Sequence, residues 1–253
     1  MDRRNRRTQN IRYLALLIAA LGTILALTIV ARSDSQQSHT VIPVPQAESW
    51  WLIRHQDTLT RIRQGNVDLL LIGDSITMGW ETKGRRIWNA YYSQRRAVNL
   101  GFSGDQTQHV LWRLDHGEID GIAPKLAIVL IGTNNAGNPD NSPETTAAGI
   151  QAILNTLRIR LPSTKILLLG PLPCDPSADS PLRQTNAAVN NRISKYADDE
   201  HIYYLDLSRL FLDDLGRLSQ DLMPDYLHPN ERGYQVWADG MEDMIRTLLA
   251  SEV

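Results

Sequence analysis

Short apolar segments that alternate with longer amphipathic segments constrain the fold of this chain more than any other feature. Five apolar runs are typical of β-strands, and four of them end at glycine: Val67–Gly73, Ala97–Gly101, Leu126–Gly132, Lys165–Gly170 and Ile202–Leu207. Most are apolar on both faces, as expected of parallel strands that helices cover on two sides. Ile150–Leu161 and Tyr234–Leu248 carry apolar residues at helical spacing. The alternation predicts an α/β fold, a doubly wound five-stranded parallel sheet in a three-layer α/β/α arrangement.

The N-terminal segment has a different composition. Five arginines lie within the first 12 residues, and the apolar run Leu14–Ala31 follows, interrupted only by Gly22, Thr23 and Thr28. At about 1.5 Å per residue, a helix over this run would be roughly 27 Å long, close to the thickness of a bilayer core. We therefore expect residues 1–32 to be a basic cytoplasmic segment and a membrane anchor, with the rest of the chain outside the cytoplasm. The alternative is a cleaved signal peptide and a secreted protein.

The remaining chain divides by composition into two parts. Residues 33–48 are polar and then rich in proline, which predicts a linker, and residues 49–253 form the predicted folded domain. The net charge is −2 and the body of the chain carries no basic stripe with interleaved aromatic residues, so we expect no nucleic-acid partner. Cys174 is the only cysteine, which excludes an intramolecular disulfide and a cysteine-rich metal cluster.

Ser75 is the first candidate for chemistry. It follows the first predicted strand in the sequence Gly73–Asp74–Ser75, where a helix is expected to begin near Ile76. A serine at this place can cap the helix, as Asp74 also can. It can equally present its hydroxyl as a nucleophile at the edge of the sheet. These residues alone leave both alternatives open.

A serine nucleophile requires a base and a carboxylate that orients the base. Asp225 and His228 lie three residues apart in "PDYLHP", just before the last predicted helix. This spacing lets the carboxylate accept the imidazole Nδ1–H and leaves Nε2 free to face a hydroxyl. The pair could instead be a turn former and a surface residue, or half of a metal site. The metal alternative is weak because no second His/Asp pair stands at ligand spacing near another strand end.

Acyl transfer also requires donors for the developing oxyanion. Gly104 in "NLGFSGD" follows the second strand, and Asn134 or Asn135 in "IGTNN" follows the third. Glycine and asparagine are also ordinary turn residues, which is the better interpretation of either stretch by itself. In a parallel sheet, however, all these strand ends meet at one edge. Their combination with Ser75 and the Asp/His pair therefore favours a serine hydrolase.

The chain resembles the SGNH (GDSL) hydrolase family at this point. "GDSITMGW", "NLGFSGD", "IGTNN" and "DYLHP" match the four motif blocks of the family in order, and the resemblance covers Val67 to Met244. The stretches Gly104–Asp120 and Pro181–Asn190 are similar to the catalytic subunits of the intracellular platelet-activating factor acetylhydrolases. The resemblance implies a flavodoxin-like fold and esterase chemistry without a metal or an organic cofactor.

The resemblance also assigns roles to the candidate residues. It implies that Ser75 is the nucleophile, that His228 is the base and that Asp225 orients it. The N–H groups of Ser75 and Gly104 and the side-chain amide of Asn134 would form the oxyanion hole. The expected function is a serine esterase for short-chain, chiefly acetyl, esters of a small molecule, glycan or lipid. The alternatives are an O-acyltransferase on the same scaffold and an inactive module that binds the cell envelope.

Overall fold

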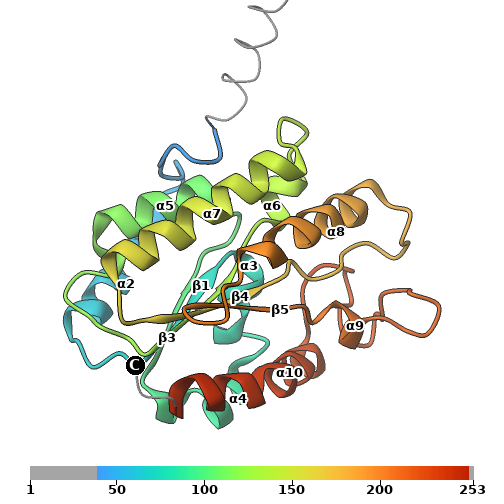
Figure 1. Ribbon diagram of the computed structural model, residues 1–253. Helices are drawn as coiled ribbons and strands as arrows, with labels where there is room; N and C mark the ends of the chain where they lie inside the picture. The colour runs from blue at the N-terminus through green and yellow to red at the C-terminus, as the bar shows by residue number, and fades with distance from the viewer. Residues whose placement is uncertain (1–38, 251–253) are drawn as a thin grey trace, which may run out of the picture. The chain divides into compact units, whose positions relative to one another are not determined.

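The computed structural model describes residues 39–250, which form a five-stranded, wholly parallel sheet with helices on both faces (Figure 1). The strand order is β2-β1-β3-β4-β5. The strands are β1 (Leu69–Gly73), β2 (Ala97–Gly101), β3 (Leu126–Leu130), β4 (Lys165–Leu169) and β5 (Ile202–Leu205). The predicted fold class, a three-layer α/β/α arrangement with a parallel sheet, is confirmed.

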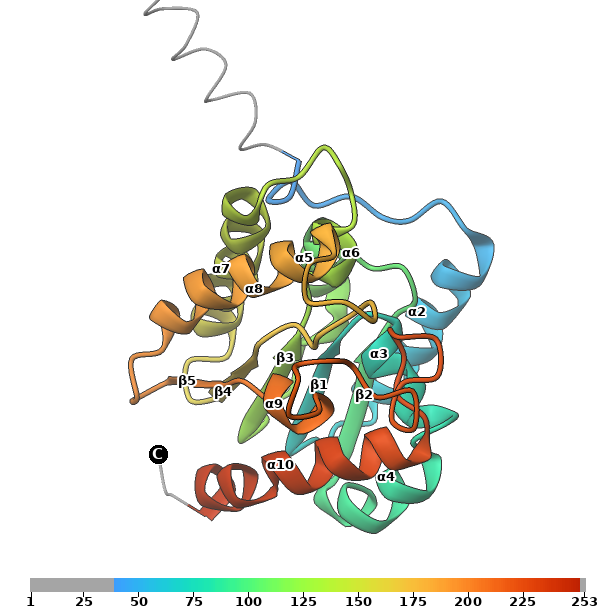
Figure 2. The ribbon, with the colours of Figure 1, turned by 90° about the vertical axis from the view of Figure 1, so that its right-hand side faces the viewer.

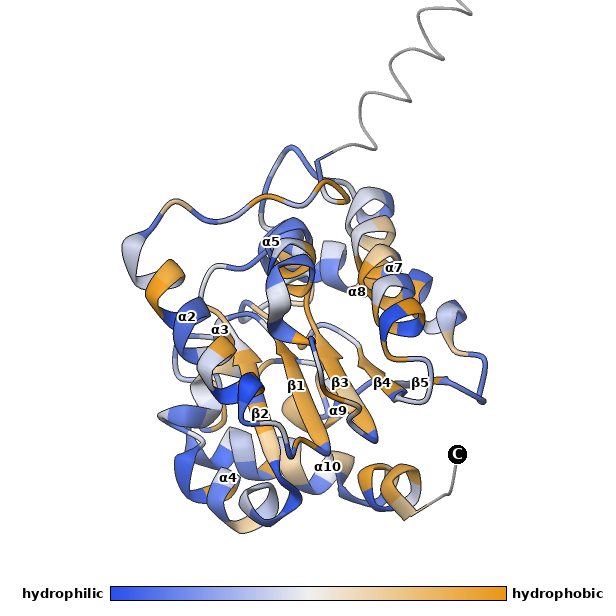
Figure 3. Ribbon diagram, turned by 90° about the vertical axis from the view of Figure 1, so that its left-hand side faces the viewer, coloured by the Kyte–Doolittle hydropathy of each residue, from blue (hydrophilic) through white to orange (hydrophobic). Residues whose placement is uncertain are grey.

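The strands lie almost level with one another. Leu69 at the start of β1 is paired with Ala97 of β2 on one side and with Leu126 of β3 on the other. Every residue of β1, β3 and β4 is buried, which explains why these runs are apolar at successive positions (Figure 3). Strands β3, β4 and β5 end one or two residues before their predicted limits, because the chain leaves the ladder there and enters a loop.

Helices cover the two faces of the sheet in separate layers (Figure 2). One face is covered by α5 (Thr107–Arg113), α7 (Pro143–Arg160) and α8 (Pro181–Ile193), and the other by α3 (Ser75–Met78), α4 (Arg85–Tyr91), α9 (Ser208–Phe211) and α10 (Glu231–Ala250). Helix α2 (Ser49–Arg63) lies beside β2, and the single turn α6 (Thr133–Ala136) contacts α7 and α8. Short 3₁₀ and π turns extend several of these helices: Gly79–Glu81, Ser93–Arg95, Leu114–Glu118 and Ser194–Tyr196.

The apolar core has two halves, one on each side of the sheet. Alternate strand residues point to opposite faces, so Leu70 and Ile72 of β1 join the half under α5, α7 and α8, whereas Leu69 and Leu71 join the half under α4 and α10. The helical spacing of apolar residues predicted from the sequence also marks the side chains that point into the core. The apolar residues of α7 and α10 that follow this spacing are buried against the sheet.

Sequence signals at the helix ends explain where two of the long helices begin. Ser142 and Ser180 each accept a backbone N–H from the first turn of α7 and α8, respectively, and each is followed by proline at the first helical position. A serine cap satisfies a backbone donor that the helix leaves unpaired, and proline has no N–H to leave unpaired. Both helices therefore begin at the point where these pairs occur.

Residues 40–48, which fall within the predicted linker, contact the domain. The Thr40 side chain is buried, and its hydroxyl donates to the Thr145 carbonyl over 2.6 Å. The Val44 N–H donates to the Gln108 carbonyl over 3.3 Å. As its proline-rich composition predicts, the segment contains no helix or strand. It nevertheless lies along the domain, because its backbone and side-chain polar groups form hydrogen bonds there.

The membrane-anchored localisation predicted from the sequence is corrected for the part of the chain that the structure describes. A bilayer core requires about 20 predominantly apolar residues in one helix. No helix between residues 39 and 250 is both long enough and apolar enough to cross it. The longest of these helices carry charges, Glu144 and Arg158 in α7 and Glu231 and Asp243 in α10. The run Leu14–Ala31, on which the prediction rests, lies outside the described residues.

Candidate active site

Ser75 is the first residue of helix α3, directly after β1. Asp74 is the residue that caps this helix, since its carboxylate accepts the Ile76 N–H over 2.9 Å. The Ser75 hydroxyl is therefore not used as the cap. Its Oγ lies 2.9 Å from Nε2 of His228, a residue 153 positions further along the chain.

Asp225 and His228 are held together by a tight loop before α10. The Asp225 carboxylate accepts the backbone N–H of His228 over 2.7 Å and that of Leu227 over 3.0 Å. Its other oxygen lies 2.8 Å from Nδ1 of the His228 ring. Burial by itself would raise the pKa of Asp225, but these hydrogen bonds outweigh it and hold the pKa below its ordinary value. Asp225, His228 and Ser75 thus form one continuous line of contacts.

Helix α3 is fixed by polar side chains to which the sequence analysis gave no role. The buried Asn99 of β2 donates to the Thr77 carbonyl over 3.0 Å, and the buried Tyr234 of α10 donates to the Ile76 carbonyl over 2.7 Å. Gly101 allows close contact, because a Cβ there would lie 2.2 Å from the Met78 nitrogen. Sequence reasoning gave Asn99 no role, although it begins the motif block "NLGFSGD". It missed Tyr234, whose only signal is a polar hydroxyl on the apolar face of a helix.

The predicted oxyanion donors come from the loops after β2 and β3. Gly104 has a φ of +75°, a backbone conformation that favours glycine. The side-chain amide of Asn134 donates to the Asp105 carbonyl over 2.9 Å, so the two loops are in contact. Asn135 is fully buried, and its side-chain oxygen accepts the Thr107 N–H at the start of α5. Of the two adjacent asparagines, Asn134 is the one that faces the Gly104 loop.

Two buried carboxylates lie close to these residues. Burial raises the pKa of Asp74 from 3.8 to about 7, and the charge of Asp105 adds to this effect. Burial also raises the pKa of Asp105, to about 6, although Arg113 and two hydrogen-bond donors oppose the shift. Among residues 39–250, no group of three or more His, Cys, Asp and Glu side chains could hold a metal ion.

A serine hydroxyl in contact with a histidine that a carboxylate orients is typical of serine hydrolases, and here it stands on a parallel α/β sheet. The model of the GDSL-like lipase/acylhydrolase family matches residues 71–236, and the chain belongs to this family. It is an enzyme of the esterase and lipase type.

Two curated relatives match most of the chain. The platelet-activating factor acetylhydrolase IB subunit alpha2 of Rattus norvegicus is 34% identical over 205 residues, which cover 81% of this chain and 87% of the relative. The alpha1 subunit of Homo sapiens is 32% identical over 208 residues, which cover 82% and 87% of the two chains. The resemblance predicted from the motifs is confirmed. These acetylhydrolase subunits give no support to the predicted membrane localisation.

Solved structures show the same fold at lower identity. A putative acylhydrolase from Bacteroides fragilis has a TM-score of 0.66 at 19% identity and is matched over 81% of this chain and 100% of its own. A putative platelet activating factor structure from Streptococcus pneumonia has a TM-score of 0.63 at 23% identity, over 78% and 94% of the two chains. An acetyl-xylooligosaccharide esterase from Geobacillus has a TM-score of 0.58 at 19% identity, over 74% and 96%.

The raised pKa of Asp74 predicts a pH-dependent stability. The folded protein holds a proton at Asp74 up to about pH 7, whereas the unfolded chain releases it near pH 4. The stabilisation is therefore complete below about pH 4 and is lost as the pH rises through 7. The substitution Asp74→Asn keeps the oxygen that caps Ile76 and cannot ionise. At pH 8 it should raise the free energy of unfolding by an amount on the order of a few kcal/mol relative to the wild type.

Urea denaturation between pH 4 and pH 8 checks this prediction. The curves of free energy against pH should converge for the two proteins at low pH and separate as the pH rises. Asp57→Asn, at an exposed position of α2, is the matched control and should leave the wild-type curve unchanged. Parallel curves for Asp74→Asn and the wild type would contradict the assignment of a buried, protonated Asp74.

Proposed function

We propose that the protein is a serine esterase that hydrolyses short-chain carboxylic esters, chiefly acetyl esters, through an acyl-enzyme intermediate. The observation that carries the proposal is the line of contacts from Asp225 through the His228 ring to the Ser75 hydroxyl, with distances of 2.8 and 2.9 Å. It supplies a nucleophile, a base and a group that orients the base, in the geometry that proton transfer requires.

The first half-reaction transfers the acyl group to the enzyme. With Nδ1–H donating to Asp225, Nε2 of His228 accepts the Ser75 proton as Oγ attacks the ester carbonyl carbon. The carbonyl oxygen becomes an oxyanion, which the N–H groups of Ser75 and Gly104 and the amide of Asn134 stabilise. The bond between the carbonyl carbon and the alkoxy oxygen then breaks, and the alcohol leaves with the proton from Nε2.

The second half-reaction releases the acid. A water molecule gives a proton to Nε2 of His228 and attacks the acyl carbon, and the same donors stabilise the second oxyanion. The bond to Ser75 Oγ breaks, and Oγ takes the proton back from Nε2. The low pKa of Asp225 supports this cycle, because the carboxylate stays ionised beside the imidazolium that forms in each half-reaction.

The preference for an acetyl group rests on the relatives. Both curated relatives described above are named as acetylhydrolases, and the identity of 32–34% extends over the greater part of each chain. The solved acetyl-xylooligosaccharide esterase has the same fold at 19% identity. We therefore infer that the acyl group is small and leave the alcohol part of the ester unassigned.

Ser75→Ala removes the proposed nucleophile. It should lower kcat for p-nitrophenyl acetate by more than about 10³-fold, with the circular dichroism spectrum unchanged. Ser93→Ala, at an exposed serine outside the site, is the control and should retain activity. A fluorophosphonate should label the wild type and not Ser75→Ala. An unlabelled wild type would instead favour a binding module on a hydrolase scaffold.

Asn134→Ala removes one proposed oxyanion donor. Because this donor acts on charge that develops in the transition state, kcat should fall by about 10²–10³-fold while KM changes little. Asn138→Ala, four residues further along the chain and after α6, is the matched control. Steady-state kinetics on p-nitrophenyl acetate give both constants. An unchanged kcat would remove Asn134 from the oxyanion hole.

The acyl preference predicts a dependence on chain length. For p-nitrophenyl acetate, butyrate and octanoate, kcat/KM should decline along the series, by at least about tenfold from acetate to octanoate. The Ser75→Ala protein gives the background rate for each ester. A kcat/KM that rises with chain length would contradict the acetyl preference and leave the esterase assignment intact.

A further inference from the structure

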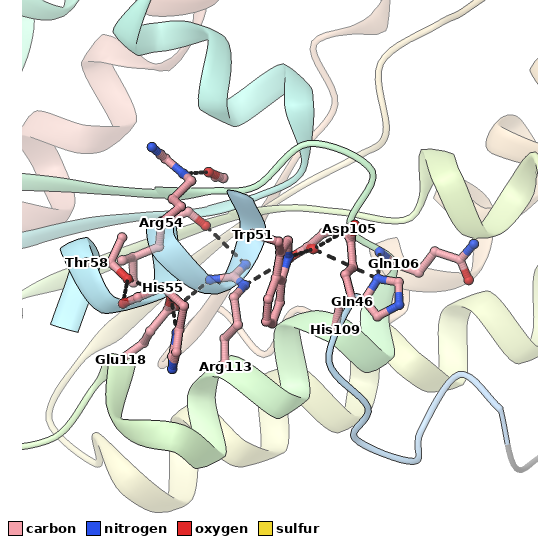
Figure 4. A network of polar contacts seen from close by, with 12 residues as sticks. Gln46, Trp51, Arg54, His55, Thr58, Asp105, Gln106, His109, Arg113 and Glu118 are labelled. Carbon is pink, nitrogen blue, oxygen red and sulfur yellow. Dashed lines mark hydrogen bonds and ion pairs between the residues drawn. The ribbon is translucent and has the colours of Figure 1, made fainter. Parts of the chain in front are cut away.

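A buried network of polar side chains connects helix α2 to the loop that carries Gly104 (Figure 4). Three of its charged members, Asp105, Arg113 and Glu118, are fully buried, and His55 is almost fully buried. Arg113 lies between the two carboxylates. Its Nε donates to Asp105 over 2.9 Å, and its Nη1 donates to Glu118. Burial of charge is costly unless each group is paired, and the mechanism proposed above uses none of these residues.

Asp105 receives two further donors from the segment before β1. Its Oδ1 accepts from Nε1 of Trp51 and from Nε2 of Gln46, each over 2.7 Å. The same Gln46 nitrogen donates to the Ser103 carbonyl over 3.1 Å. The residues on either side of Gly104 are therefore both tied to residues 46–51. Gly104 has no side chain of its own to hold its left-handed backbone in place.

The other end of the loop is tied to the same arginine. Nη2 of Arg113 donates to the Leu100 carbonyl over 3.2 Å, and its guanidinium lies 4.0 Å from the centre of the Phe102 ring. The backbone carbonyl of Asp105 accepts the side-chain amide of Asn134. Asp105 is thus bound through its side chain to α2 and α5, and through its backbone to the second proposed oxyanion donor.

We propose that Trp51 and Gln46 are positioning residues, which set the geometry of the oxyanion hole by holding Asp105 between Gly104 and Asn134. The proposal rests on the proposed function. Trp51 and Gln46 precede residues 71–236, the stretch that the family model matches, so the motifs do not identify them. Because an oxyanion hole acts through donors already in place, a small displacement of the Gly104 loop should reduce transition-state stabilisation more than substrate binding.

The substitutions Trp51→Phe and Gln46→Met test the proposal in the full-length chain. Each removes an N–H donor to Asp105 and keeps a side chain of similar size and shape. Trp112→Phe is the matched control: its ring lies 5.3 Å from the Trp51 ring in the same aromatic cluster, but makes no hydrogen bond to Asp105. Urea denaturation should show comparable, modest destabilisation for the two tryptophan variants.

Kinetics on p-nitrophenyl acetate should separate positioning from stability. Trp51→Phe and Gln46→Met should each lower kcat by roughly tenfold with KM nearly unchanged, whereas Trp112→Phe should retain kcat. An unchanged kcat in both variants, or an equal loss in Trp112→Phe, would overturn the proposal.

Hydrogen–deuterium exchange tests the same proposal without activity. Amide exchange across residues 101–106 should be about tenfold faster in Trp51→Phe and Gln46→Met than in the wild type, and unchanged in Trp112→Phe. If the wild type hydrolyses no ester but the variants show these exchange rates, the proposed function is wrong, and the network still holds the Gly104 loop in place. Exchange unaltered by either substitution would overturn the proposed positioning role, whatever the activity.

Discussion

The level, parallel alignment of β1, β2 and β3 is the constraint on which the site depends. Gly73 at the end of β1 is paired with Gly101 of β2 on one side and with Leu130 of β3 on the other. The chain therefore leaves all three strands at one edge of the sheet. After β1 the chain passes to β2 on one side of β1, and after β2 it crosses to β3 on the other side. The strand order therefore reverses between β1 and β3. Ser75, Gly104 and Asn134 follow these strand ends, in the place where such folds bind ligands.

Two aspartates near this edge, Asp225 and Asp74, have pKa values shifted in opposite directions. Burial and hydrogen bonding compete at both of them. Asp225 is largely exposed and accepts several hydrogen bonds, which hold its pKa below the ordinary value. Asp74 is buried, and burial outweighs the hydrogen bond from the Ile76 N–H and raises its pKa to about 7. The Asp225 carboxylate can therefore stay ionised beside a protonated His228 ring. The Asp74 carboxyl group instead accepts a backbone N–H of α3. The balance of burial against hydrogen bonding decides which role each has.

The part of the chain before β1 contacts the loop that carries Gly104. Residues 40–48 and helix α2 lie outside the stretch matched by the family model, and yet Gln46 and Trp51 reach Asp105 beside Gly104. A family match identifies the residues that carry the chemistry. It does not identify those that hold the loops in place, because the same loop can be supported by different side chains. Part of the support of the Gly104 loop is electrostatic, because the buried Arg113 is paired with the carboxylates of Asp105 and Glu118.

Local sequence determined the strands, the long amphipathic helices and the Asp225–His228 pair, because periodicity and a three-residue spacing are properties of neighbouring residues. It also brought Ser75, Gly104 and the asparagines into one candidate site, through the rule that parallel strands end together. The family resemblance favoured Asn134 over Asn135, and the tertiary structure adds the contacts of each: the Asn134 amide donates to the Asp105 carbonyl, whereas Asn135 is buried against the start of α5. The tertiary structure alone placed Trp51 against Asp105, 54 positions away, and packed residues 40–48 on the domain. Such contacts depend on chain segments that meet only after folding, and no pattern of neighbouring residues encodes them.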